Sequence, residues 1–110
     1  MEIQDNLRKS LLAEIYEPLL TSKQQNMLRM FLDSNISLSE IAEEFDISRQ
    51  AVNDLVKRTF RVLEDYESKL KLLEKFEEIK STISDCSQLL DNSADKEQIK
   101  AKLNSILEVL

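Results

Sequence analysis

Apolar side chains recur at intervals of three and four residues along most of the chain, which is the spacing of amphipathic helices. The first stripe predicts a helix over residues 5–17, and Pro18 should end or bend it because proline has no amide hydrogen to donate. The second stripe predicts a helix over residues 22–33, with Ser22 and Gln25 spaced as a capping box. The two stripes consist of Leu7, Leu11, Leu12, Ile15 and Leu19, followed by Met27, Leu28, Phe31 and Leu32.

The segment around which the chain is organised covers residues 38–60 and reads LSEIAEEFDISRQAVNDLVKRTF. Ser37 and Glu40 are spaced as a capping box before one short helix, and Ser48 can cap the next. Asp46 lies at the turn, where the backbone must be left-handed; glycine is common there, and aspartate tolerates that conformation better than most residues. Two short helices joined by a tight turn predict a helix-turn-helix, which lays its second helix in the DNA major groove. The positions expected to pack between the helices are Ile41, Ala42, Phe45, Ile47, Val52 and Leu55.

The outer face of the second helix carries candidate contacts to nucleic acid. Arginine reads guanine, and glutamine or asparagine reads adenine, through paired hydrogen bonds in the major groove. The base-reading candidates on this argument are Arg49, Gln50 and Asn53. The candidates for phosphate contacts are Ser48, Lys57, Arg58 and Arg61, with Lys23 at the start of the preceding helix. The simpler alternatives are a packed helical hairpin with a solvated polar face and, for Lys23, a purely solubilising role.

Beyond Phe60 the pattern predicts that the same helix continues, because no helix-breaking residue occurs before Asp91. Its apolar positions follow a heptad seam that slips by three residues at Phe76 and then resumes. The seam consists of Leu63, Tyr66, Leu70, Leu73, Phe76, Ile79 and Ile83. Because a lone helix would leave this seam in water, we expect a homodimer through the tail. The alternative is a break near residues 65–68 that folds residues 69–90 back onto the domain.

The chain should end in one further helix, which follows a linker at residues 91–95. Its apolar stripe consists of Ile99, Leu103, Ile106 and Leu110, and it needs a partner, either the preceding helix or another subunit. The expected organisation is therefore a helix-turn-helix domain over residues 1–67 and a helical extension, the dimerisation region, over residues 68–110.

Composition supports an all-α fold and restricts where nucleic acid can bind. The 110 residues include no glycine and one proline, whereas β-hairpin turns normally need glycine. The net charge of −6 weighs against a dedicated duplex binder, which is usually basic. However, residues 48–61 carry four basic residues and one acidic residue, a local net charge of +3. Contact with nucleic acid should therefore be confined to the second helix of the motif and be sensitive to salt.

Several kinds of chemistry are missing from the sequence. The absence of histidine and glycine excludes imidazole catalysis, histidine metal sites and glycine-rich phosphate loops. Adjacent carboxylates such as Glu77 and Glu78 diverge on a helix, so we expect a non-enzyme without metal or cofactor. Cys86 is the only cysteine and should be packing filler on an apolar helix face. With no signal peptide and no apolar stretch of membrane length, the lone thiol predicts a cytoplasmic protein.

The run SLSEIAEEFDISRQAVNDLVKRT resembles the YlxM family, small cytoplasmic helix-turn-helix proteins of Gram-positive bacteria. The resemblance extends to LLTSKQQNMLRMF before the run and EDYESKLKLLEKFE after it, and covers residues 7–80. The first two stretches also resemble region four of bacterial primary sigma factors, which reads the promoter −35 element. The resemblance implies an all-α, dimeric, DNA-binding-like protein associated with the signal recognition particle pathway.

The region-four pattern implies that bases are read by Arg49, Gln50, Asn53 and Asp54. Asp54 departs from the neutral or basic residue of a sigma factor, which weighs against recognition of a −35 element. The favoured function is a DNA-binding regulator linked to the signal recognition particle. The alternative is a protein- or RNA-interaction module of that particle, which contacts its partner through the acidic tail. A third interpretation is a helical adaptor whose motif no longer binds DNA.

Overall fold

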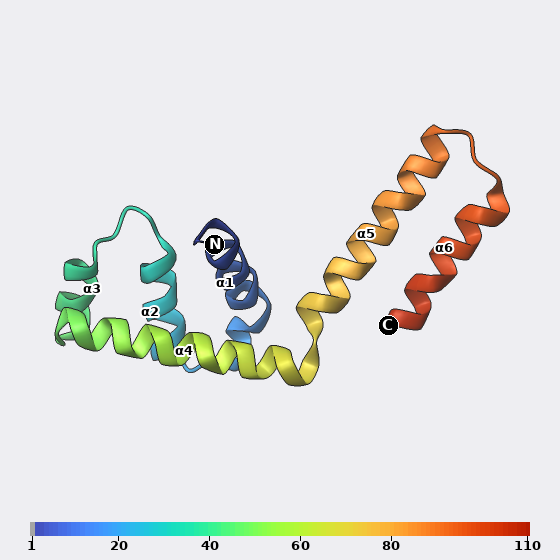
Figure 1. The fold of residues 1–110 in the computed structure, drawn as a ribbon. Helices are drawn as coiled ribbons and strands as arrows, with labels where there is room; N and C mark the ends of the chain where they lie inside the picture. Colours follow the sequence, from blue (N-terminus) through green and yellow to red (C-terminus); the bar gives the residue numbers. More distant parts are fainter. Residues whose placement is uncertain (1) are drawn as a thin grey trace. The chain divides into compact units, whose positions relative to one another are not determined.

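The computed structural model describes residues 2–110, and all regular structure in these residues is helical (Figure 1). This confirms the all-α fold. The described residues divide into two compact units, one ending at Leu70 and the other covering Lys71–Leu110. The elements are α1 (Glu2–Tyr16), a 3₁₀ turn η1 (Glu17–Leu19), α2 (Ser22–Leu32), α3 (Leu38–Phe45), α4 (Arg49–Leu70), α5 (Leu72–Asp91) and α6 (Lys96–Val109).

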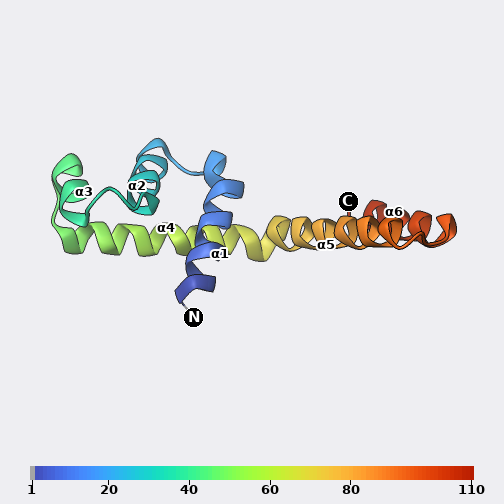
Figure 2. The same ribbon diagram turned by 90° about the horizontal axis from the view of Figure 1, so that it is seen from above.

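The first unit is built on α4, which contacts each of α1, α2 and α3 (Figures 1 and 2). Val52, Leu63, Ile41, Leu12 and Tyr16 have at most 1% of their surface exposed and form the centre of the core. Because apolar burial is the main favourable term in folding, this shared contact with α4 holds the other three helices in place.

The predicted inner stripe of the first helix is wrong at both ends. Leu7 and Leu19 are 60% and 53% exposed, whereas Ala13 and Tyr16 are buried. Leu7 is exposed because α1 crosses α4 instead of lying along it, so only residues near the crossing are covered (Figure 2). Leu19 lies beyond α1, in the 3₁₀ turn η1. The helix ends before Pro18, as predicted.

Of the two predicted capping boxes, the one before α2 is wrong and the one before α3 is confirmed. Thr21, one residue earlier than predicted, caps α2, and its hydroxyl accepts a hydrogen bond from the Gln24 amide at 3.2 Å. Gln25 is unavailable for capping because its side-chain amide donates to the backbone oxygen of Glu17 at 2.8 Å. The predicted box before α3 is present, with the Ser37 hydroxyl accepting from the Glu40 amide at 3.1 Å.

The turn between α3 and α4 has the predicted left-handed residue. Asp46 has φ 52° and ψ 48°, and its amide donates to the carbonyls at the end of α3. Ile47 donates to the Ala42 carbonyl at 3.0 Å, and the Ser48 hydroxyl accepts from the Ala51 amide at 3.0 Å. These contacts end α3 and start α4 within three residues, which is the geometry of a helix-turn-helix.

The prediction of one unbroken helix to Asp91 is wrong. The helix ends at Leu70, and Lys71 adopts a left-handed conformation with φ 55° before α5 begins. This break lies three residues beyond residues 65–68, the alternative site. A heptad pattern fits one long helix or two shorter ones, and no glycine or proline marks the break. Leu63, the first seam position, is fully buried in the core of the first unit.

The second unit is a hairpin of α5 and α6, so the last helix packs on the preceding one. The linker lies where predicted: Ser93 is left-handed, and the Asp95 carboxylate caps α6 by accepting from the Glu97 amide at 3.1 Å. Cys86 is buried, as a filler residue should be. Among residues 2–110, no helix is both long and apolar enough to cross a membrane.

Candidate nucleic-acid interface

The amino-terminal part of α4 presents most of the base-reading candidates to solvent. Arg49 is the first residue of the helix, and Arg49, Gln50 and Asp54 are all exposed. Asn53 is half-buried, so it faces outward less than predicted. At about 100° per residue it lies between the outer face and the buried positions of α4, and this explains its partial burial.

Gln50 and Asp54 contact each other. The Gln50 side-chain amide donates to a carboxylate oxygen of Asp54 at 3.1 Å, one helical turn along α4. A glutamine amide has a second hydrogen and an oxygen, so it can still bind the edge of a base while Asp54 holds it. The carboxylate that departs from the sigma-factor pattern therefore acts in the structure to orient its neighbour.

One basic groove lies between the start of α2 and α4, with a volume of about 170 Å³. It brings together Lys23 and Arg58, which are 35 positions apart in the sequence and were both phosphate candidates. The complete lining is Thr21, Lys23, Gln24, Met27, Leu55, Arg58 and Thr59. We call this space the α2 groove.

A second basic groove lies between α1 and α4, with a volume of about 350 Å³, and we call it the α1 groove. It joins the phosphate candidates Lys57 and Arg61 to Lys9, whose ammonium lies 5.2 Å from the centre of the Phe60 ring. The complete lining is Lys9, Leu12, Lys57, Phe60, Arg61 and Glu64. Sequence reasoning missed Lys9, because only the crossing of α1 over α4 brings it to this face.

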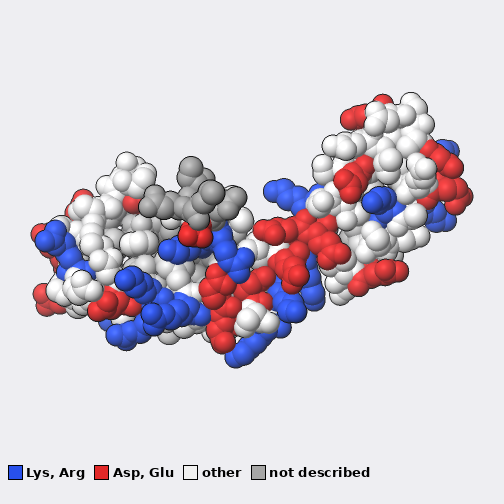
Figure 3. Space-filling model, in the orientation of Figure 1, with Lys and Arg blue, Asp and Glu red and all other residues white. Residues whose placement is uncertain are grey.

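The basic stretch of α4 gives way to an acidic one toward the carboxyl end of the helix (Figure 3). Glu64 and Asp65 are exposed and Glu67 is buried there. Beyond Arg61, Glu64 pairs with Arg8 and Asp65 pairs with Lys69, so the surface suited to nucleic acid ends near Arg61.

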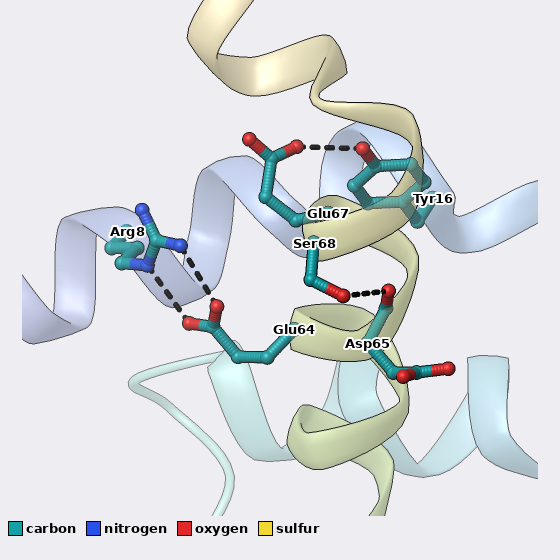
Figure 4. A network of polar contacts seen from close by, with 6 residues as sticks. All are labelled: Arg8, Tyr16, Glu64, Asp65, Glu67 and Ser68. Carbon is teal, nitrogen blue, oxygen red and sulfur yellow. Dashed lines mark hydrogen bonds and ion pairs between the residues drawn. The ribbon is translucent and has the colours of Figure 1, made fainter.

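A polar network holds α1 against α4 beside the α1 groove (Figure 4). Arg8 donates two hydrogen bonds to the Glu64 carboxylate, both at 2.8 Å. These bonds, together with the positive charge of Arg8, hold the pKa of Glu64 below its ordinary value despite some burial. The Tyr16 hydroxyl donates to the buried Glu67 carboxylate at 2.6 Å. The network therefore fixes the position of α1, and with it Lys9.

Relatives of known sequence place the chain in a family. The family described as "Putative helix-turn-helix protein, YlxM / p13 like", UPF0122, matches residues 3–106. The chain belongs to this family. It is 42% identical to a UPF0122 protein of Halalkalibacterium halodurans over 104 residues, which are 94% of this chain and 95% of that protein. It is 41% identical to the UPF0122 protein YlxM of Bacillus subtilis strain 168 over 106 residues, 96% of each chain. A UPF0122 protein of Bacillus mycoides is 39% identical over 108 residues, 98% of this chain and 96% of that protein.

These matches confirm the resemblance drawn from the sequence and extend it. Residues 7–80 carried the resemblance, whereas the family match continues through α5 and most of α6, to residue 106. The segment that forms the helical hairpin is therefore part of the family match and not peculiar to this chain. Metal ligands do not gather in the described residues in groups of three or more.

Proposed function

We propose that the protein is a DNA-binding regulator that inserts the start of α4 into the major groove of duplex DNA. The observation that carries this proposal is the helix-turn-helix itself, whose second helix begins with exposed Arg49 and Gln50 and continues into a cluster of cations. Arginine and glutamine at the start of such a helix are suited to hydrogen bonding with base edges. Membership of a family described as helix-turn-helix proteins supports the proposal.

Each candidate residue has a distinct role in this proposal. Arg49 and Gln50 read bases, and Asp54 holds the Gln50 amide in place. Asn53 reads bases less directly, since it is half-buried. The Ser48 hydroxyl accepts a hydrogen bond from the Ala51 amide, so its own hydrogen is available to donate to a phosphate. Lys23, Lys57, Arg58 and Arg61 contact phosphates.

The proposed target is not a promoter −35 element. The resemblance to sigma region four places Arg49 and Gln50 at base-reading positions, but Asp54 brings a negative charge to a position where that pattern has none. A carboxylate near the bases accepts from cytosine and repels phosphate. We therefore expect a regulator with its own site.

The experiment is fluorescence anisotropy of labelled duplexes, including sequences selected by the protein from a random pool. Arg49→Ala should reduce the difference in affinity between selected and random duplexes by about 1–3 kcal/mol. Lys57→Ala should weaken binding to all duplexes alike and lower the salt dependence. Lys100→Ala, which changes an exposed lysine of α6, is the matched control. Wild-type protein that ignores duplex DNA at low salt, or that binds like Arg49→Ala on every sequence, would refute the proposal.

A second candidate function is protein interaction within the signal recognition particle pathway, which the family resemblance implies. The favouring observation is the acidic surface of the second unit, where Glu77 and Glu78 are exposed on α5. Exposed carboxylates suit a partner with basic residues. If this function holds, Glu77→Lys with Glu78→Lys abolishes binding to the particle's protein in a titration, and Arg49→Ala leaves it intact. Unchanged binding by the double variant would exclude this surface.

A further inference from the structure

The two basic grooves lie on different sides of α4. Arg58 of α4 lines the α2 groove, whereas Lys57 lines the α1 groove. One residue separates these two cations, which corresponds to roughly 100° around a helix of 3.6 residues per turn. The exposed surface between the grooves includes Gln50 and Asp54, the base-reading end of the helix.

Both grooves offer positive charge that no ion pair among residues 5–110 neutralises. Within the described part of the chain, no ion pair joins Lys9, Lys57 or Arg61 to a carboxylate. Glu64 is the one acidic residue that lines the α1 groove, and Arg8 occupies both of its oxygens. Three neighbouring cations repel one another, so an anion between them is stabilised.

The α2 groove has the same character. Lys23 and Arg58 line it, and no ion pair among residues 5–110 involves either side chain. Thr21 and Gln24 cap the start of α2 beside it, and no acidic residue lies in the lining. Each side of α4 therefore carries a separate groove lined by basic side chains.

We propose that these grooves bind the backbones of the two strands of one B-form DNA duplex, with Lys9 of α1 as a phosphate contact outside the helix-turn-helix. A helix with its side chains is about 10–12 Å across, and the major groove of B-DNA is about 12 Å wide, so one backbone passes on each side of the helix. This inference rests on the proposed function and deepens it. It assigns Lys23 and Arg58 to one strand, and Lys9, Lys57 and Arg61 to the other.

The inference also specifies the kind of nucleic acid. The major groove of an RNA duplex is deep and narrow, so a helix flanked by two phosphate sites does not fit there. A single strand supplies one backbone and leaves the other groove empty. The protein should therefore prefer duplex DNA to an RNA duplex of the same sequence and to either single strand.

The first experiment measures anisotropy of these probes against salt concentration with the full-length protein. Lys9→Gln removes the charge of the lysine and keeps most of its length, and it should lower the salt slope on duplex DNA by about one. Arg58→Gln should do the same, and the double variant should lower the slope by about two, because the sites are separate. Lys69→Gln is the control, since Lys69 lies on α4 but pairs with Asp65 at 3.0 Å and lines neither groove. Thermal melting confirms that each variant is folded.

The second experiment asks which strand each groove contacts. Lys9→Cys and Arg58→Cys each receive a photoactivatable crosslinker and are irradiated on a selected half-site whose strands carry different labels. The two positions should crosslink to opposite strands. Crosslinks to the same strand overturn the inference, as does a Lys9→Gln slope equal to that of the wild type or equally tight binding to duplex RNA. These results would leave the proposed function standing, provided that the protein still binds duplex DNA in a way that depends on Arg49. If the wild-type protein does not bind duplex DNA at all, the proposed function fails as well.

Discussion

Asp46 sets the path of the chain between the two helices of the motif. Its φ of 52° lies in the left-handed region, which most side chains avoid at a cost of about 1–2 kcal/mol. Aspartate tolerates this region, and its amide also closes the end of α3 by donating to the carbonyls of Ala42 and Glu43. A residue that resists this conformation would disturb the relative placement of α3 and α4.

Substitutions at Asp46 should therefore follow backbone preference. Asp46→Gly should leave the free energy of unfolding within about 0.5 kcal/mol of the wild type, because glycine adopts a positive φ readily but gains entropy when unfolded. Asp46→Val should lower it by about 1–2 kcal/mol. Urea denaturation measures both changes. Glu44→Val, at an exposed helical position two residues earlier, should lower the free energy of unfolding by less than Asp46→Val does. A valine at position 46 that costs no more than one at position 44 would contradict this account.

Single residues around the turn between α3 and α4 were predicted well because the signal there is local. Ser37, Glu40 and Asp46 act through neighbours within four positions, so their spacing in the sequence is sufficient. The bond from Gln50 to Asp54 is equally local, but its meaning depends on which faces of α4 are exposed. Lys9 was missed because it meets Lys57 and Arg61 across about fifty residues of chain. Only the packed structure brings such residues together.

At the scale of elements, the pairing of α1 with α4 depends on polar contacts as well as apolar burial. Arg8 and Glu64 form a two-bond ion pair between the helices, with side chains 47% and 49% exposed. Water screens the charges of a half-exposed ion pair, so this pair contributes less than about 1 kcal/mol to the free energy of unfolding. The pair matters for the proposed contact with DNA because α1 carries Lys9.

The Arg8–Glu64 pair should make stability depend on pH in a defined direction. The pKa of Glu64 is lower in the folded protein than its ordinary value near 4.5, so the contribution is complete above that value. It is lost as the pH falls through the lowered folded-state pKa, where the carboxylate becomes protonated. Glu64→Gln should therefore reduce the free energy of unfolding at neutral pH and match the wild type in acid.

Denaturation of both proteins over a pH series measures this difference. Glu43→Gln, which removes an exposed carboxylate of α3 outside the contact between α1 and α4, is the control. A gap between wild type and Glu64→Gln that grows as the pH falls would show that the pair does not stabilise the fold in this way.

Helix existence was easier to predict than helix ends. The periodicity identified every α-helix except that it joined α4 to α5, and the break at Lys71 has no glycine or proline to signal it. A lysine pays an energetic cost for its positive φ, so the surrounding packing must favour the break. The residues of the predicted heptad seam therefore lie in different environments. Leu63 is buried in the first unit, whereas Phe76 and Ile83 are exposed in the second.

At the scale of the whole molecule, the exposed apolar side chains of the second unit need an explanation. Phe76, Ile83 and Leu90 recur every seven residues on α5 and are 49%, 53% and 64% exposed. Leu103 and Leu107 on α6, and Leu110 directly after it, are at least as exposed as Phe76. Apolar residues at heptad spacing form one stripe, and a second helical hairpin buries such a stripe well. We propose that two copies of the protein associate through these faces.

A homodimer would carry two copies of α4 and so two sets of base-reading residues, which compensates for the weak electrostatic attraction of an acidic chain to DNA. Ile83→Glu should disrupt it. Burial of one isoleucine contributes about 1.5–3 kcal/mol, and the substitution occurs in both copies, so the dissociation constant should rise by about two orders of magnitude or more. Sedimentation velocity over a concentration series measures the change. Ser84→Glu adds the same charge at the next, exposed position and should leave the association intact. Wild-type protein that sediments as a monomer at every concentration would exclude the dimer, and an equal effect of both variants would place the contact elsewhere on the hairpin.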